Sequence, residues 1–174
     1  MNKMLYILAF TLFFTSCQKQ KIGFVDNGIL VNESQQKKDI EAKFQLKKDA
    51  FKIKTDSIGK IFQKEVLADQ ANAQKLYKQN RIDKAEVIIT NLQQKQQKLQ
   101  QELQIEQQLL TKEFQNEIDS VITTVKTFVK SYGENNGYTY ILGTSDATST
   151  VMYGVEANNI TKPVLEALNS AYSK

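Results

Sequence analysis

Few residues of this 174-residue chain have side chains that could carry out chemistry. It contains no histidine and only one cysteine, which excludes a histidine general base, a Ser-His-Asp triad, a histidine-ligated metal ion and an internal disulfide. Carboxylates are plentiful, but they are scattered among lysines on stretches that favour helix, so a solvated charged surface is the preferred interpretation. Asp26 ends a short apolar stretch and has no catalytic partner in the sequence. We therefore expect that the protein is not an enzyme and that it has no cofactor and no metal site.

The single cysteine, Cys17, ends a stretch that has the features of an export signal. A short polar head with one lysine precedes an apolar run from Met4 to Phe14, and a Thr-Ser dipeptide separates this run from the cysteine. Such a run is too short to span a bilayer comfortably and is typical of a signal peptide. The order resembles a lipobox, the cleavage and lipidation site of bacterial lipoproteins, although Phe14 stands where leucine is usual. We expect that residues 1–16 are removed and that Cys17 carries lipid; the alternative is an ordinary secretory signal cleaved near a cysteine.

Export and lipidation would decide where the mature chain acts. Residues 17–21 would be a polar, lipidated tether, and several acyl chains anchor stably because each buried methylene contributes about 0.8 kcal/mol. The expected location is the periplasm, with the protein held at a membrane through the lipid on Cys17. That compartment lacks ATP, and the sequence has no Gly-rich phosphate loop, so we expect a mechanism without nucleotide and no nucleic-acid partner.

A long interval without helix breakers dominates the middle of the chain. Neither glycine nor proline occurs between Gly59 and Gly133, and such a long interval without a helix breaker predicts long helices. We expect an antiparallel helical hairpin over residues 33–132, with its turn near residues 80–83. Asp83, with Glu86 three residues later, resembles a capping box at the start of the second helix.

The two helices are expected to pack along a thin apolar seam. In the first helix, apolar residues recur at the seven-residue spacing of a coiled coil, at Phe44, Phe51 and Ile58. In the second helix, nine of the sixteen residues 93–108 are glutamine, and the remaining apolar stripe is too narrow for a globular core. Gln96 and Glu106 stand where the seam should have apolar residues. We therefore expect a hairpin whose middle is weakly held and able to splay.

Short segments that favour β structure flank the hairpin on both sides. The sequence predicts strands at Ile22–Asp26, at residues 138–142 and from Val151. Residues 22–32 and 133–174 would together form a β-rich body. Three short strands make only a marginally stable sheet, so we expect oligomerisation to complete this body.

A short helix is expected to close the chain. Thr161 is a plausible N-cap for it, and Pro163 suits its first turn. Together the elements predict an α+β, mainly α fold, in which a long antiparallel coiled-coil hairpin projects from a small β body formed by oligomerisation.

In this order of elements, behind an export signal, the chain resembles the Skp/OmpH family of periplasmic chaperones. The resemblance lies in the Gln/Lys-rich hairpin and in the stretches Lys21–Leu30, Asn135–Leu142 and Val151–Asn169. The last stretch is the most specific, because family members close with a strand, an Asp-Ile-Thr-like cap and a Val-Leu-rich helix. This chain has Asn-Ile-Thr at the cap, beginning at Asn159.

The resemblance implies a homotrimer in which three small sheets form one barrel-like body and three hairpins surround a cavity. It also implies an ATP-independent holdase that binds unfolded outer-membrane β-barrel proteins and prevents their aggregation until they reach the assembly machinery. The lipid anchor departs from the soluble members of the family. A function of another class stays open: a structural coiled-coil envelope lipoprotein that acts as a spacer or scaffold and holds no client.

A basic segment of the first helix is the candidate client-binding surface. Residues 37–64 contain nine lysines and four carboxylates, and such an excess attracts acidic partners over long range. For any single lysine, a solvated surface is the simpler interpretation. The candidate client-binding residues are Lys43, Lys47, Lys48, Lys52 and Lys54.

The substitution Cys17→Ala is expected to leave an exported protein without lipid, because it removes the thiol that would be acylated. Membrane fractionation and mass spectrometry of the intact chain measure both properties. A wild-type chain that fractionates as a soluble, unacylated protein would contradict the assignment of Cys17.

Overall fold

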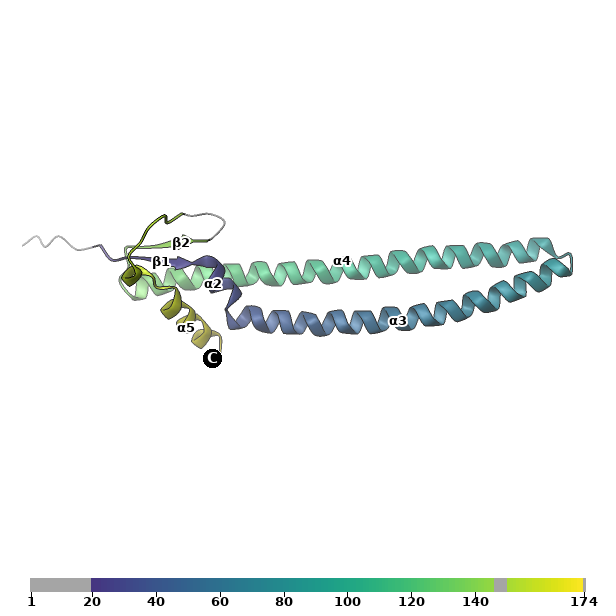
Figure 1. Cartoon of the computed structure of the whole chain (residues 1–174), viewed down its shortest axis with the longest axis horizontal. Helices are drawn as coiled ribbons and strands as arrows, with labels where there is room; N and C mark the ends of the chain where they lie inside the picture. Colours follow the sequence, from purple (N-terminus) through teal and green to yellow (C-terminus); the bar gives the residue numbers. More distant parts are fainter. Residues whose placement is uncertain (1–19, 146–149, 174) are drawn as a thin grey trace, which may run out of the picture.

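The computed structural model describes residues 20–145 and 150–173. Residues 1–16 and Cys17, on which the export and lipidation predictions rest, lie outside the described residues. Two long helices form an arm, and the strands and short helices gather at one end of it (Figure 1), which is the α+β, mainly α architecture that the sequence predicts. The elements are β1 (Ile22–Asp26), α2 (Asn27–Asn32), α3 (Gln35–Lys78), α4 (Ile82–Asn135), β2 (Tyr140–Thr144), η1 (Glu156–Asn158) and α5 (Thr161–Tyr172).

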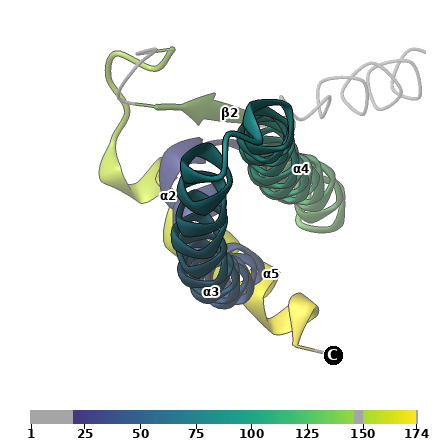
Figure 2. The same ribbon diagram turned by 90° about the vertical axis from the view of Figure 1, so that its right-hand side faces the viewer.

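The arm is an antiparallel hairpin of α3, with 44 residues, and α4, with 54 residues. At about 1.5 Å per residue, α4 is about 80 Å long. Ser34 caps α3, because its hydroxyl accepts a hydrogen bond from the Lys37 N–H at 3.3 Å. The chain reverses at Asn80, whose φ of +58° lies in the left-handed region that asparagine tolerates. A view along the arm shows the two helices side by side (Figure 2).

The predicted capping box at the start of α4 is wrong. Asp83 lies inside the first turn of the helix, and the N-cap is Arg81, whose side chain makes no capping hydrogen bond. The turn is closed by main-chain bonds instead, since the Arg81 N–H donates to the Leu76 carbonyl at 2.9 Å. Asp83 still favours the helix, because an acidic side chain in the first turn interacts well with the helix dipole.

The body contains a two-stranded parallel sheet. β1 and β2 pair in a register that aligns Ile22 with Tyr140 and Asp26 with Thr144. Parallel strands need a crossover connection, and here the whole arm with α2 is that connection. The strand at Ile22–Asp26 agrees with the prediction, and β2 begins two residues later than predicted.

The strand predicted from Val151 is wrong, because residues 151–155 form no strand. A single bridge from Phe24 to Asn159 lies on β1 instead, and the Ile160 N–H donates to the Phe24 carbonyl at 2.9 Å. The chain turns into α5 directly after this bridge, so no further hydrogen bonds between strands form along β1 at this side.

Thr161 connects β1 to α5, although not as the predicted N-cap. It is the first residue of α5, and its hydroxyl accepts a hydrogen bond from the Asp26 N–H at 2.9 Å. The same hydroxyl donates to Asn159 Oδ1 at 2.8 Å. α5 also caps the arm, because Asn169 Oδ1 accepts a hydrogen bond from the Gln35 N–H at 2.8 Å. The bond from Gln35 to Asn169 attaches the arm to the body, and the two bonds of Thr161 join β1 to α5 within the body.

The buried core lies where the arm joins the body. It consists of Val25, Leu30, Ile40, Phe44, Val121, Val125, Ile160, Val164 and Leu168. Farther along the arm, the fully buried residues of the described chain are Ala73 and Ala85, near the tip. The seam residues between these two regions, such as Phe51 and Ile58, are half-buried. Most of the arm therefore faces water, and a thin seam joins its helices.

Candidate functional site

The described residues contain no group of three or more histidine, cysteine, aspartate or glutamate side chains that could hold a metal ion. None of the described helices combines the length and the apolar character needed to cross a membrane. The candidate functional surface is therefore the arm, where long side chains of α3 and α4 face each other and the solvent.

Four ion pairs connect α3 to α4 along one flank of the arm, and we call them the ladder. In three of them an α3 lysine meets an α4 glutamate, and in the fourth, nearest the tip, the signs are reversed. The pairs are Lys43–Glu117 at 2.8 Å, Lys47–Glu113 at 2.5 Å, Lys54–Glu106 at 2.6 Å, and Lys95 with Glu65. Along each helix the ladder residues are separated by steps of four, seven and eleven residues, which return to the same helix face.

The ladder defines a single register of the two helices. In every pair, the α3 residue and the α4 residue lie the same number of positions before and after Asn80. The alignment of the two helices is therefore constant along the arm. Asn80 is also the residue whose positive φ reverses the chain. The turn and the ladder therefore specify the same pairing of the helices.

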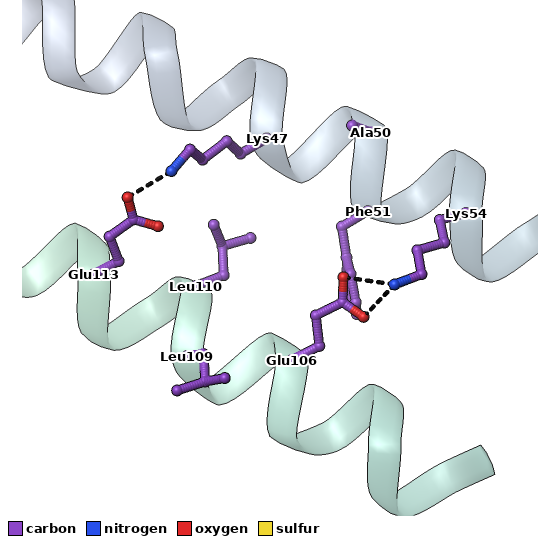
Figure 3. Close-up of a pocket in the computed structure, with 8 residues that line it drawn as sticks. All are labelled: Lys47, Ala50, Phe51, Lys54, Glu106, Leu109, Leu110 and Glu113. Carbon is purple, nitrogen blue, oxygen red and sulfur yellow. Dashed lines mark hydrogen bonds and ion pairs between the residues drawn. The ribbon is translucent and has the colours of Figure 1, made fainter.

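Between its pairs, the ladder leaves apolar hollows open to solvent. The pairs Lys47–Glu113 and Lys54–Glu106 bracket one such hollow of about 370 Å³ (Figure 3). Phe51 of α3 and Leu110 and Leu109 of α4 line it between the charged pairs. Leu109 is 61 % exposed, so an apolar side chain of a partner could reach it without breaking an ion pair.

Hydrogen bonds within the ladder shift the pKa values of two of its members, Glu113 and Lys43. The hydrogen bond from Lys47 holds the pKa of the Glu113 carboxyl below its ordinary value of 4.5. The hydrogen bond to Glu117 raises the pKa of the Lys43 ammonium above its ordinary value of 10.5. Both groups are therefore charged throughout the neutral range.

The flank on the other side of the seam has no ladder, and we call it the open flank. A hollow of about 240 Å³ lies on it and shares Phe51 and Leu110 with the hollow in the ladder. Its lining includes Lys48, whose ammonium lies 5.7 Å from the centre of the Phe114 ring. The lining of this hollow is Phe44, Lys48, Phe51, Gln107, Leu110, Thr111 and Phe114.

The five lysines predicted to bind a client fall into two groups. Three of them belong to the ladder: Lys43, Lys47 and Lys54. Lys48 and Lys52 form no ion pair in the part of the chain that the structure describes, and both are exposed. Sequence reasoning missed the ladder, although a signal was present: the spacing of its lysines on α3 is repeated in reverse by the glutamates on α4.

The predicted positions of Gln96 and Glu106 within the seam need correction. Gln96 is exposed and lies outside the seam. Glu106 lies beside the seam, where the Lys54 ammonium donates to both of its carboxylate oxygens, at 2.6 and 2.9 Å. A polar residue in the repeat therefore contacts the opposite helix at this position.

Comparison with known proteins agrees with this architecture. The family model described as Outer membrane protein (OmpH-like) matches residues 21–168. Among solved structures, that of a protein from Caulobacter crescentus described as an outer membrane chaperone (OmpH-like) is similar, with a TM-score of 0.66 and 15 % sequence identity over 91 % of each chain. No curated protein matches the sequence. At this identity the likeness to the solved structure shows the fold, and the family model covers nearly the whole described chain.

The ladder predicts how stability depends on pH. The pKa of Glu113 is lowered in the folded chain, so its contribution is present above pH 4.5 and is lost as the pH falls through the folded value. The pKa of Lys43 is raised, so its contribution is present below pH 10.5 and is lost as the pH rises through the folded value. The midpoint temperature of thermal unfolding, followed by circular dichroism, should therefore decrease in acid, where Glu113 is protonated, and in strong base, where Lys43 loses its proton.

The control for this experiment is the variant Glu113→Gln. It keeps the length of the side chain and should lose less stability in acid than wild type. An identical acid limb in both proteins would show that Glu113 contributes nothing to the pH dependence.

Proposed function

The chain belongs to the OmpH-like family of outer membrane proteins, and on this premise we propose that it is an ATP-independent holdase chaperone. Its clients are unfolded outer-membrane β-barrel proteins in the periplasm, which it keeps from aggregating. The observation that carries the proposal is an arm that exposes aliphatic side chains on both helices while its own seam stays closed.

The exposed apolar surface of the arm suits a client without a fixed shape. These side chains are spread along the arm and are not gathered in one deep pocket; they include Leu46, Ile53, Ile61, Leu67, Ile105 and Leu109. Many weak contacts on a long surface favour promiscuous binding, because no single contact demands a particular sequence. Segments of an unfolded barrel protein that are spread along such a surface cannot pair with each other.

Charge supports the capture step of this proposal. Residues 37–64 carry nine lysines and four carboxylates, and three of these lysines are neutralised by glutamates of the ladder. Lys48 and Lys52 lie exposed on the same helix, and neither forms an ion pair with another described residue. We expect these two lysines to attract acidic clients over long range, with an effect on capture that salt screens.

A homotrimer is part of the proposal, and the sheet supports it. β2 is an edge strand of a two-stranded sheet, and Tyr140 and Leu142 on it are exposed. The loop that follows exposes Met152 and Tyr153 almost completely. A free edge with apolar side chains tends to pair with another chain, and three copies joined in this way would complete the body.

Lipid on Cys17 is proposed to hold this assembly at a membrane, so that each arm reaches about 65 Å from the anchored body, the length of the 44 residues of α3. A second candidate function follows from the ladder, since ion pairs along the arm favour a stiff spacer or scaffold. The two functions differ in whether the protein suppresses the aggregation of an unfolded barrel protein.

The holdase proposal predicts that wild-type protein suppresses light scattering when an acidic barrel protein is diluted out of urea without ATP. In stopped-flow experiments, the pair of substitutions Lys48→Gln and Lys52→Gln should slow capture at low salt and have little effect on release. High salt should make the capture rates of wild type and of this variant nearly equal, because salt at about 0.15 M screens charges that are more than about 8 Å apart.

The matched control replaces Lys126 and Lys130 by glutamine, which changes the net charge equally on the part of α4 near the body. It should leave capture unchanged. Scattering that wild type does not reduce would contradict the holdase function and favour the scaffold, whereas equal capture by all three proteins would remove only the role of the two lysines.

The trimer proposal predicts that the mature chain sediments as three copies at micromolar concentration. The pair of substitutions Tyr140→Asp and Leu142→Asp should give folded monomers, because both side chains are exposed in the single chain and charges on an edge strand prevent pairing. An Ile53→Asp control on the arm should remain trimeric. A wild-type chain that sediments as a folded monomer would overturn this proposal.

A further inference from the structure

We propose that a stripe of five glutamines on α4 binds the main chain of an extended client, which gives the holdase function proposed above a contact that does not depend on client sequence. The stripe consists of Gln93, Gln97, Gln100, Gln104 and Gln107. Its members are separated by alternating steps of four and three residues, which keep all five on one face of the helix.

The amides of the stripe are free, unlike those of three glutamines elsewhere on the arm. Each of these three donates to an aspartate four residues later: Gln35 to Asp39 at 2.7 Å, Gln45 to Asp49 at 3.0 Å, and Gln115 to Asp119 at 2.9 Å. Within the described chain, the stripe side chains are all exposed and make no such bond. The cause is in the sequence, because the residue four positions after each member is another glutamine or a threonine.

The stripe lies on the open flank of the arm. Gln107 lines the hollow that also contains Lys48 and Phe114, and the other four glutamines continue along the same face toward the tip. Glu106, its neighbour in sequence, points to the ladder on the other side of the seam. The stripe is therefore not used to hold the two helices together.

The chemistry of the stripe matches an unpaired main chain. A glutamine amide has two donor hydrogens and one acceptor oxygen, so it can bond both the N–H and the C=O of an extended segment. A lysine offers donors alone, and an ionised carboxylate offers acceptors alone. The main-chain groups of α4 are already bonded within the helix, which leaves the side-chain amides as the groups available to a client.

The spacing of the stripe also fits an extended segment. Successive members are about 5 Å apart along the helix, and an extended chain presents equivalent groups about every 7 Å. The flexible glutamine side chain takes up this difference over a few residues. An unfolded barrel strand has lost its neighbours and exposes such groups along its length, whatever its side chains are.

The experiment uses two matched triple variants in the Cys17→Ala chain. The stripe variant carries Gln93→Ala, Gln100→Ala and Gln107→Ala. The control carries Gln94→Ala, Gln101→Ala and Gln108→Ala, which are equally exposed and have the same spacing, one residue further around the helix. Both variants change helix propensity and side-chain volume by the same amount.

We expect the stripe variant to release an unfolded barrel protein about fivefold faster than wild type, because each lost hydrogen bond at a wet surface is weak. The control should stay within about twofold of wild type, which is the range of a neutral surface change. Release is measured by adding an excess of unlabelled client to a labelled complex.

A pair of peptides tests whether the contact is to the main chain. One has the sequence of a barrel strand, and the other has the same side chains with methyl groups on alternate main-chain nitrogens. Wild type and the control should prefer the unmodified peptide in competition, and the stripe variant should lose most of this preference.

The outcomes separate this inference from the holdase function. If wild type does not retain the client at all, both proposals fail. If wild type retains it and the two triple variants release it equally, the holdase function stands and the stripe proposal is overturned. It is also overturned if the stripe variant keeps the preference for the unmodified peptide, because the contact is then to client side chains.

Discussion

The structure depends on one constraint, the constant antiparallel register of α3 and α4. The arm has no wide core, because beyond Phe44 the described seam buries only Ala73 and Ala85 completely. Each exposed ion pair of the ladder contributes only about 0–1 kcal/mol, so the ladder acts less by strength than by position. A slip of one heptad breaks all four pairs and brings only one ladder lysine opposite another ladder glutamate, and in one direction it also sets Glu65 against Glu102. The ladder thus selects the register that the turn at Asn80 begins.

A fixed register lets the two flanks of the arm differ. The ladder flank neutralises its lysines and leaves apolar hollows between the pairs, one of them with Leu109 exposed beside it. The open flank has Lys48 above an aromatic hollow and continues into glutamines whose amides are free. Apolar contact, unpaired positive charge and main-chain hydrogen bonding are therefore available on a single arm. On the proposed holdase function, a client without a fixed shape would use all three while the helices remain paired with each other.

Much of the fold follows from the sequence, because its causes are local. The interval without glycine or proline predicts the long helices, and the β-forming residues Ile22–Asp26 predict β1. The errors arise where a distant contact decides. Residues after Val151 favour strand, but β1 is satisfied by Asn159 and Ile160 at the entrance to α5. Of the five candidate lysines, three meet glutamates more than fifty residues away, and the pairing becomes visible only when the register is known. The stripe is different, because whether its amides are free depends on the residue four positions later, which can be read directly from the sequence.

The central claim is that the arm stays paired in one register while its outer surface holds a client. The most direct test is a distance measurement by double electron–electron resonance in the Cys17→Ala chain. Spin-labelled cysteines replace two exposed residues, Ser57 on α3 and Gln101 on α4. The labelled chains are diluted with unlabelled ones, so that distances within one arm dominate the signal. The account predicts one narrow distance distribution that is the same with and without an unfolded barrel protein. A distribution that lengthens or broadens when the client is added would show that the client enters between splayed helices, and it would contradict the account.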